Sequence, residues 1–151
     1  MGLIVYTDGG CSGNPGPGGW AYVIVEGDRT MKGSGAMANT TNNQMELTAV
    51  IEALGRISAE PALAGSEVEV FTDSQYVRNG ITQWIVRWEK NGWKTAGKKP
   101  VKNRELWQRL RALEQRLRVS WNWVTAHRGI ELNELVDSMV QQEIARLVAA
   151  R

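Results

Sequence analysis

The sequence predicts one mixed α/β domain spanning residues 1–151, in which a five-stranded sheet carries helices on its faces. The length of 151 residues, with 42% hydrophobic and 23% charged residues, is that of an ordinary globular domain with its own core. Three strand-like segments near the N-terminus are separated by turn residues, which is typical of an antiparallel meander. Strands then alternate with helical patterns, and this order favours a mixed sheet covered by helices.

The meander comes first. Residues 1–8 form a nearly unbroken apolar and β-branched run, which is typical of a strand buried on both faces. The stretch 9–19 is rich in Gly and Pro and is expected to be a loop. Two further strands are expected at 20–25 and 30–35, joined by a turn at 26–29.

Helices and strands alternate over the rest of the chain. Residues 40–43 are all helix-capping types, so a helix is expected over 44–57, and Pro61 and Gly65 mark a loop after it. The remaining expected elements, in order, are a strand at 68–73, a helix at 74–78 that Asn79 and Gly80 can end, a helix at 81–89, an irregular basic loop at 93–102, a helix at 103–118, a strand at 119–124, a loop at 127–129 and a helix at 132–150.

Cysteine content and hydropathy restrict the cellular setting. Cys11 is the only cysteine, which excludes an internal disulfide and fits a reducing compartment. The sequence has neither a signal-peptide pattern nor an apolar run long enough to span a membrane. We therefore expect a cytoplasmic protein that does not associate with membranes.

Two carboxylates stand on helix faces that are otherwise apolar. On the expected helix at 44–57, Glu46 shares a stripe with Ala49, Val50, Ala53 and Ile57. Asp137 shares a face of the last expected helix with Val140, Ile144 and Val148. The alternatives are that Glu46 lies at the edge of its stripe, where the helix dipole favours an anion, and that Asp137 is an exposed first-turn acid.

Two further carboxylates, Asp8 and Asp73, each end an expected strand. A charge at the inner end of a buried strand is unfavourable unless something pairs with it. Asp8 could instead begin a turn, and Asp73 could instead cap the helix that follows. One explanation covers all four acids. We expect them to converge on a cation. Without a bound cation, like charges at close range would raise one another's pKa and destabilise the fold.

The type of ligand indicates the type of metal. Carboxylates without a Cys or His cluster favour a hard ion, Mg²⁺ or Mn²⁺, over zinc. Mg²⁺ keeps several waters and is typically shared with substrate phosphates. Four carboxylates suit two ions about 3.5–4 Å apart, the arrangement used in phosphoryl chemistry.

Basic and aromatic residues are concentrated in one segment. Residues 87–104 contain seven Lys or Arg and one acid, Glu89, so the segment carries +6 whereas the whole chain carries +2. Trp84, Trp88, Trp93 and Trp107 lie in or beside it. Phosphate neutralisation and aromatic stacking favour a nucleic-acid partner. The alternative is that the tryptophans pack the helices, as the i, i+4 spacing of Trp84 and Trp88 allows, and that the lysines solvate a loop.

Several motifs together resemble bacterial type 1 ribonuclease H over essentially the whole chain. They are Thr7-Asp8-Gly9, Gly13-Asn14-Pro15-Gly16-Pro17-Gly18-Gly19, Thr41-Asn42-Asn43-Gln44-Met45-Glu46-Leu47, Thr72-Asp73-Ser74-Gln75-Tyr76-Val77, Gly92-Trp93-Lys94-Thr95, Lys99-Pro100-Val101-Lys102-Asn103 and Asn133-Glu134 ahead of Asp137. The resemblance implies a ribonuclease H-like fold with a five-stranded mixed sheet flanked by helices. It also implies an endonuclease that cleaves the RNA strand of RNA–DNA hybrids and leaves 5′-phosphate and 3′-hydroxyl ends.

The resemblance implies roles for individual catalytic residues. Asp8, Glu46, Asp73 and Asp137 match the family's four metal-binding carboxylates, which are expected to hold two Mg²⁺ ions with substrate bound, or Mn²⁺ as a substitute. His127 matches a mobile histidine near the site and would shuttle a proton or help release the product. A lone histidine is more often structural or incidental, and the neighbouring Gly129 and acidic helix weaken that alternative.

The resemblance also implies how a hybrid is held. Asn14, Asn42 and Gln75 are expected to read 2′-hydroxyls and base edges of the RNA strand, and Thr41 and Asn103 are expected to grip a DNA phosphate. For Asn14 and Asn42 the alternative is turn or cap duty. The other residues expected to bind substrate are Asn43 from the same motif, Trp84, Trp88 and Trp107 of a DNA-strand channel, and Lys90, Lys94, Lys98, Lys99 and Lys102 of a basic handle at about 84–104.

The sequence departs from the family pattern after the fifth strand. Ala126 stands where Gly is usual, and residues 128 and 130–132 differ from the commoner loop, which affects the placement of His127. Gln141 stands one turn after Asp137, where a basic residue is common. The expected partner is an RNA–DNA hybrid, bound by a monomer without an obligate protein partner.

Two rival functions remain at this point. One is a hybrid-binding module with weak or lost catalysis, which the four intact carboxylates argue against. The other is a related metal nuclease, such as a resolvase or transposase-like domain, which the 2′-hydroxyl-reading residues and the basic handle argue against.

Overall fold

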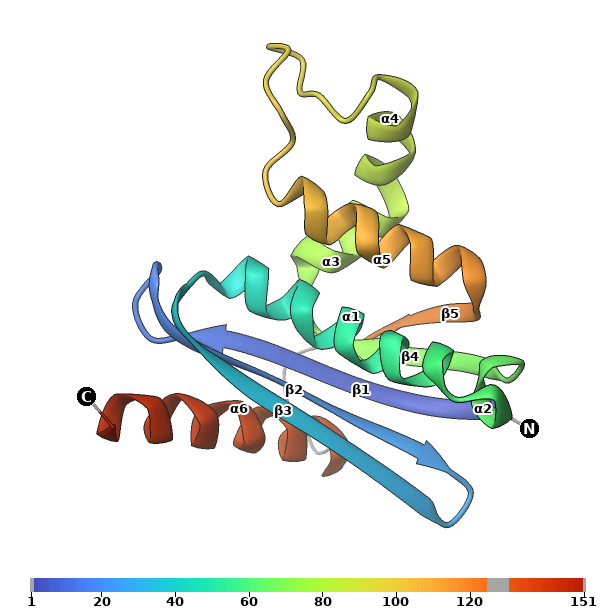
Figure 1. The fold of residues 1–151 in the computed structure, drawn as a ribbon, viewed down its shortest axis with the longest axis vertical. Helices are drawn as coiled ribbons and strands as arrows, with labels where there is room; N and C mark the ends of the chain where they lie inside the picture. Colours follow the sequence, from blue (N-terminus) through green and yellow to red (C-terminus); the bar gives the residue numbers. More distant parts are fainter. Residues whose placement is uncertain (1, 125–130, 151) are drawn as a thin grey trace.

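The computed structural model describes residues 2–124 and 131–150 and contains one five-stranded sheet in the order β3-β2-β1-β4-β5 (Figure 1). The pairs β1–β2 and β2–β3 are antiparallel, whereas β1–β4 and β4–β5 are parallel. The expected mixed sheet is therefore confirmed. The strands are β1 (Gly2–Cys11), β2 (Gly16–Glu26), β3 (Arg29–Thr40), β4 (Glu67–Thr72) and β5 (Arg118–Trp123).

Helices cover both faces of this sheet. Helices α1 (Asn42–Ala59) and α5 (Arg104–Arg116) lie over one face, and α6 (Glu131–Ala149) lies over the other (Figure 1). The shorter helices are α2 (Pro61–Ala64), α3 (Gln75–Asn79), the π-helical segment η1 (Gly80–Trp84) and α4 (Ile85–Lys90). Along the described residues, no helix has both the length and the apolar character that crossing a membrane requires.

The two faces of the sheet are covered to different extents. A large core lies on the α1 side, and a smaller one lies between α6 and the opposite face. Ile4 in β1 is 37% exposed, so the prediction that the first strand is buried on both faces is wrong at its beginning. Val148 is 46% exposed, so the apolar stripe on α6 stops contributing before the helix ends. The smaller core between α6 and the sheet therefore includes neither Ile4 nor Val148.

The Gly- and Pro-rich stretch is mostly strand, contrary to the expected loop at 9–19. Pairing between β1 and β2 continues without interruption from Ile4 opposite Val25 to Cys11 opposite Gly18. A Cβ at Gly9 would collide with the Met45 backbone, and a Cβ at Gly18 would collide with the Thr40 side chain. These glycines therefore allow the start of α1 to lie directly against the sheet.

Gly80 continues a helical run that it was expected to end. The chain passes from α3 through η1 into α4 without a break. Gly80 is buried, and a Cβ there would overlap the ring of Trp107 in α5. Its role is close packing between two helical segments rather than termination. The loop expected at Pro61 is also helical, because α2 begins with Pro61 at its first position, where proline is well tolerated.

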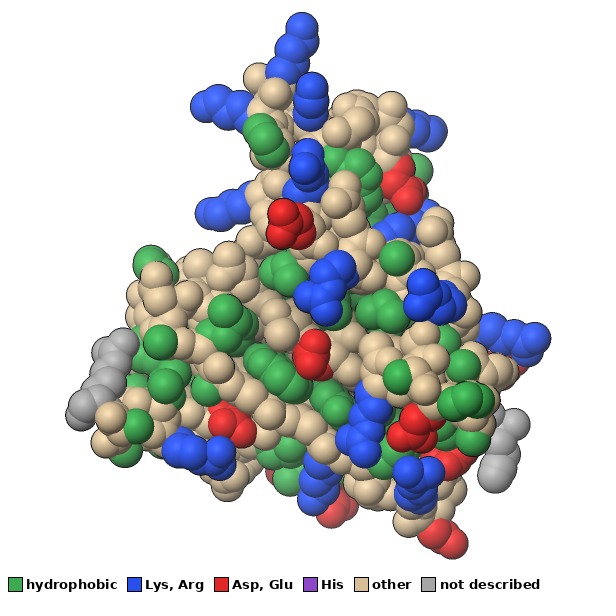
Figure 2. All heavy atoms as spheres, in the orientation of Figure 1, with side chains coloured by type: hydrophobic (Ala, Val, Ile, Leu, Met, Phe, Trp, Pro, Cys, Tyr) green, Lys and Arg blue, Asp and Glu red, His purple; other side chains and the backbone are tan. Residues whose placement is uncertain are grey.

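We call residues 84–104 the handle. The handle projects away from the sheet and consists of the end of η1, α4 and the loop that leads to α5 (Figure 1). Figure 2 shows Lys and Arg side chains pointing outward around its far end. The lysines at 90, 94, 98, 99 and 102 are all exposed. The positive charge expected from the sequence is therefore available to a partner.

Replacing Gly80 with Ala should lower the free energy of unfolding by about 1–3 kcal/mol, because the added Cβ would overlap Trp107. The control is Gly55→Ala in α1, where the space around a Cβ is open. This control should raise the free energy of unfolding by about 0.5–1 kcal/mol through helix propensity. Urea unfolding followed by circular dichroism measures both changes. Equal stability of Gly80→Ala and the wild type would contradict the close packing of α3, η1 and α5.

Candidate active site

Asp8 and Asp73 lie in register just beyond the paired part of two neighbouring parallel strands. Parallel pairing of β1 with β4 ends at Tyr6 opposite Phe71, and each aspartate follows two residues later. Asp8 does not begin a turn, because β1 continues there and Asp8 pairs with Ala21 of β2. Asp73 does not cap α3 either, because the Ser74 hydroxyl oxygen accepts the hydrogen bond from the Val77 N–H.

Glu46 and Asp137 reach the same region from opposite faces of the sheet. In α1 the stripe that contains Glu46 is buried as expected, with Ala49, Val50, Ala53 and Ile57 fully inaccessible. In α6, Val136 and Val140 on either side of Asp137 are buried. Asp137 lies beyond the first turn, whose acids are Glu131 and Glu134. Burial of the apolar faces therefore carries both acids toward the end of the sheet.

All four predicted carboxylates line one pocket of about 330 Å³. Its other lining residues are Gly9, Gly10, Asn42, Val140 and Gln141. The four acids come from β1, α1, the residue after β4, and α6. The structure thus brings together residues that are up to 129 positions apart in the chain, as the convergence hypothesis predicts.

Burial and mutual repulsion perturb two of the four carboxyl groups. Burial, followed by the charges of Asp73 and Asp137, raises the pKa of Asp8 to about 8. Burial also raises the pKa of Glu46 to about 7, and the charge of Asp73 adds to this effect, while a hydrogen bond with Ser74 opposes it. Ser74 therefore both caps α3 and contacts Glu46. Concentrated negative charge of this kind is typical of a functional site.

The donor set fits a hard divalent cation. Carboxylate oxygens are the ligands that Mg²⁺ and Mn²⁺ prefer. Within the described residues, no three or more His, Cys, Asp or Glu side chains form a ready-made metal cage. The carboxylates instead line an open pocket, which suits an ion that keeps several waters and shares its ligands with a substrate.

The residues expected to read RNA lie around this pocket. Asn42 lines it, and its backbone N–H donates a 3.2 Å hydrogen bond to the Asn14 side-chain oxygen. Gln75 is exposed and lines a neighbouring pocket of about 290 Å³ that also contains Asp73. Asn43 is exposed at the start of α1. Their positions are compatible with the expected role, which stays a prediction.

Thr41 and Asn103 are joined through Gln44. The Thr41 hydroxyl oxygen caps α1 by accepting from the Gln44 N–H at 3.2 Å, and the Gln44 side-chain amide donates to the Asn103 oxygen at 3.3 Å. The Asn103 amide donates in turn to the Tyr76 hydroxyl at 3.1 Å. Asn103 has a left-handed backbone with φ of 60°. This chain of contacts connects the start of α1 with the start of α5.

The tryptophans divide into buried and accessible residues. Trp107 is fully buried, and its indole N–H donates to the Tyr76 hydroxyl at 3.0 Å. A buried side chain cannot contact a nucleic acid, so the prediction that Trp107 binds substrate is corrected: it supports the handle from within the core. Trp84 and Trp88 are half-buried and line an apolar pocket of about 340 Å³ with Lys102.

One predicted residue cannot be placed, and four residues near the site were not predicted. The predicted residue is His127, which lies outside the described residues. Ser74, Gln44 and Tyr76 were not among the predicted site residues, although all three belong to the motif strings. Arg78 lies 5.8 Å from the ring centre of Trp123 beside Gln75, and it was also missed. The signals available were the capping potential of Ser74 and the position of Arg78 in the helix after Asp73.

Protonation of the pocket should control the stability of the metal-free protein. Asp8 and Glu46 have ordinary pKa values of 3.8 and 4.5 and folded values of about 8 and about 7. The folded state therefore holds protons that the unfolded chain releases. Stability from these groups is complete below about pH 4 and is lost as the pH rises to about 8.

Asp8→Asn should therefore raise the melting temperature of the metal-free protein at pH 8 by about 2–4 °C for each kcal/mol of relieved repulsion. It should also flatten the decline between pH 5 and pH 8. Thermal unfolding in EDTA across this range provides the measurement. The control is Glu69→Gln, which changes an exposed acid of β4 outside the pocket. If the melting temperature depended on pH equally in Asp8→Asn and in the wild type, the proposed repulsion among the pocket carboxylates would be refuted.

Comparison with known proteins agrees with this geometry. A family model for RNase H matches residues 1–145. A curated protein named Ribonuclease H from Phenylobacterium zucineum (strain HLK1) is 50% identical over 149 residues, covering 99% of this chain and 94% of the relative. A second, from Paracoccus denitrificans (strain Pd 1222), is 50% identical over 154 residues, covering 99% of this chain and 96% of the relative.

Solved structures agree as well. LC9-RNase H1, described as a type 1 RNase H with the type 2 active-site motif, has a TM-score of 0.83 at 29% identity and covers 97% of this chain and 73% of that chain. LC11-RNase H1, solved in complex with an RNA/DNA hybrid, has a TM-score of 0.70 at 28% identity and covers 97% of this chain and 99% of that chain. The resemblance seen in the motifs is thereby confirmed, and the chain belongs to the ribonuclease H family of nucleases.

Proposed function

We propose that this chain is an endonuclease that hydrolyses the RNA strand of RNA–DNA hybrids and leaves 5′-phosphate and 3′-hydroxyl ends. The observation that carries the proposal is one pocket lined by Asp8, Glu46, Asp73 and Asp137. A similar family member, LC11-RNase H1, was solved with an RNA/DNA hybrid, which supports the substrate class. The exposed lysines of the handle suit a polyanionic duplex.

The four carboxylates would hold two Mg²⁺ ions, with Mn²⁺ as a substitute. Such ions, when bound, supply an activated water and neutralise charge on the leaving 3′-oxygen. The chain itself would position the carboxylates. Ser74, which caps α3, lies close to Glu46 and favours the charged form of its carboxyl group. Asp8 lies in register with Asp73, which directly follows the neighbouring strand β4, so the sheet sets the spacing of this pair.

Substrate choice would follow from contacts with the two strands. Asn14, Asn42, Asn43 and Gln75 would contact the RNA strand near the pocket, where 2′-hydroxyl groups distinguish RNA from DNA. Thr41 and Asn103 would bind a phosphate of the DNA strand at the junction of α1 and α5. Trp84 and Trp88, with Lys90, Lys94, Lys98, Lys99 and Lys102, would bind the DNA strand along the handle. His127 would shuttle a proton or assist product release.

A cleavage assay on end-labelled duplexes tests this function. The wild type with Mg²⁺ should cut the RNA strand of a hybrid and leave an all-DNA duplex intact, and EDTA should abolish cutting. Asp73→Asn should reduce kcat by at least about a hundredfold, because it removes a metal-binding carboxylate. Hybrid affinity of this variant should be retained, since the handle is unchanged. Glu69→Gln, on the strand before Asp73, serves as the control with full activity.

Three outcomes would contradict the proposal. Efficient cutting of the all-DNA duplex would favour a less selective metal nuclease. Hybrid binding without any cleavage by the wild type would favour a binding module. Near-normal turnover by Asp73→Asn at saturating Mg²⁺ would exclude the two-metal assignment.

Replacement of Lys90, Lys94 and Lys99 by Ala should raise KM severalfold at moderate salt. Each phosphate contact that is lost should reduce the slope of log affinity against log salt by about 0.9 on a B-form duplex. The turnover number should change little, because these lysines lie outside the carboxylate pocket. Steady-state kinetics across a KCl titration measures both. A triple variant of exposed cations elsewhere, Lys32, Arg116 and Arg118 to Ala, is the matched control. An unchanged salt slope would show that the handle merely solvates the surface.

A further inference from the structure

The handle is joined to the rest of the molecule by two different kinds of contact. The first is aromatic: the ring centre of Trp88 lies 5.6 Å from that of Trp107, and the ring centre of Trp84 lies 5.7 Å from that of Tyr76. The second kind is polar and directional. It includes the bonds of Asn103 with Gln44 and Tyr76 at the base of the handle, and a separate set that begins at Glu89 in α4.

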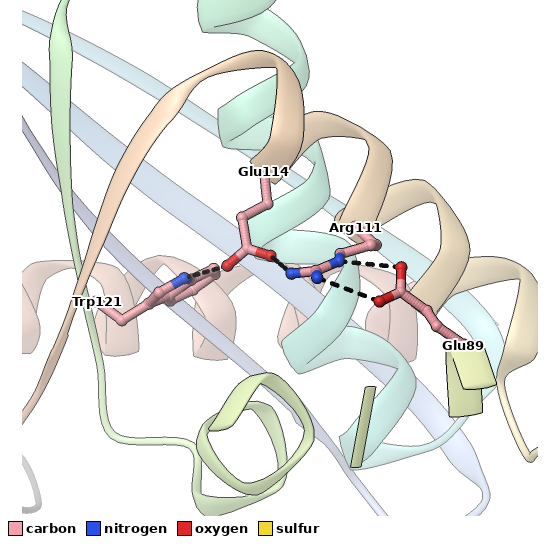
Figure 3. Close-up of polar contacts among 4 residues, drawn as sticks. All are labelled: Glu89, Arg111, Glu114 and Trp121. Carbon is pink, nitrogen blue, oxygen red and sulfur yellow. Dashed lines mark hydrogen bonds and ion pairs between the residues drawn. The ribbon is translucent and has the colours of Figure 1, made fainter. Parts of the chain in front are cut away.

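Glu89 starts a chain of hydrogen bonds that crosses from the handle to the sheet (Figure 3). The Arg111 guanidinium in α5 donates from Nε and NH2 to the two Glu89 oxygens, each at 3.1 Å. Its NH1 donates to Glu114 Oε1 at 2.8 Å. The other Glu114 oxygen accepts from the indole N–H of Trp121 in β5 at 2.7 Å. Four side chains thus connect α4, α5 and β5.

The geometry makes this network stronger than an ordinary surface ion pair. An exposed pair contributes little, whereas a guanidinium that forms two parallel bonds with one carboxylate is stronger and directional. The Arg111, Glu89 and Glu114 side chains are 25%, 34% and 15% exposed. Hydrogen bonds with Glu114 and Glu89 raise the pKa of Arg111, a side chain that is charged at neutral pH in any case.

We propose that Glu89, Arg111, Glu114 and Trp121 form a strut that sets the angle of the handle on the sheet and thereby positions the handle's lysines for binding a hybrid. They are positioning residues, since they lie outside the residues that line the carboxylate pocket. The inference rests on the proposed function, because it assigns the strut a role in binding that same substrate.

The negative charge of Glu89 distinguishes a positioning role from a purely electrostatic one. Glu89 is the one acid among residues 87–104, which otherwise carry seven cations. If charge alone mattered, Glu89→Gln would strengthen binding of a polyanion, because it removes a repulsive group. If the strut positions the handle, the same change weakens binding, because Gln cannot accept both bonds from Arg111. The two explanations predict opposite signs.

The experiment measures KM and kcat for hybrid cleavage at fixed salt, with thermal unfolding of each variant. Glu89→Gln should raise KM about three- to tenfold and leave kcat within about twofold. Arg111→Lys keeps the charge and loses the two-bond geometry, so it should raise KM similarly. The double variant should show little additional effect, because both changes break the same link. Trp121→Phe removes one donor without a charge change and should raise KM in the same direction.

Glu105→Gln is the matched control. It removes an equal charge from an exposed acid of α5 outside the strut, and should leave KM unchanged or lower. A lower or unchanged KM in Glu89→Gln, or additive effects in the double variant, would overturn the inference. If a variant folds poorly, its inactive fraction lowers kcat rather than raising KM. In that case the KM of Trp121→Phe decides whether the strut positions the handle. Failure of the wild type to cleave a hybrid would instead refute the proposed function and leave the strut's geometry untouched.

Discussion

The close approach of two helices to the same pair of strands is the constraint on which the pocket depends. Gly9 and Gly18 leave no room for a side chain between the sheet and the start of α1. On the other face, a Cβ at Gly19 of β2 would lie only 3.0 Å from the Val140 backbone oxygen of α6, which is tighter than an ordinary contact. Larger residues here would move α1 and α6 outward, and Glu46 and Asp137 would move with them. The glycine-rich stretch therefore determines how near the four carboxylates come to one another.

Hydrophobic burial and electrostatic repulsion oppose each other in this pocket. Burial of Ala49, Val50 and Ala53 holds α1 against the sheet, and Glu46 is carried inward with them. The unfavourable burial of negative charge is reflected in the raised pKa values of Asp8 and Glu46. A bound cation would compensate the same charges, so metal binding and folding stability are linked. This linkage explains why a group of acids that weakens the metal-free fold is compatible with a stable working protein.

Residues whose role depends on a repeating pattern could be predicted from the sequence, because periods of 2 and 3.6 assign side chains to faces. The convergence of Asp8, Glu46, Asp73 and Asp137 followed from this principle. Gly80 could not be predicted, because its role depends on Trp107, which lies 27 residues away in the chain. Asp73 and Ser74 are both good capping residues, and tertiary structure decides between them. The i, i+4 pattern at Trp84 and Trp88 likewise does not show that Trp107 is the fully buried ring.

The contacts around Gln44 connect the two parts of the proposed substrate surface. Gln44 bonds to Asn103 at the base of the handle, and Glu46 lies two residues later on the same helix. Movement of the handle relative to the sheet would therefore disturb Asn103 and α1 before it reached the carboxylates. If the DNA strand is held at Asn103 and the RNA strand is cut at the pocket, the distance between these sites must match the width of the duplex. Hybrid selectivity would then depend on the rigidity of this junction as well as on the contacts of Asn14, Asn42 and Gln75.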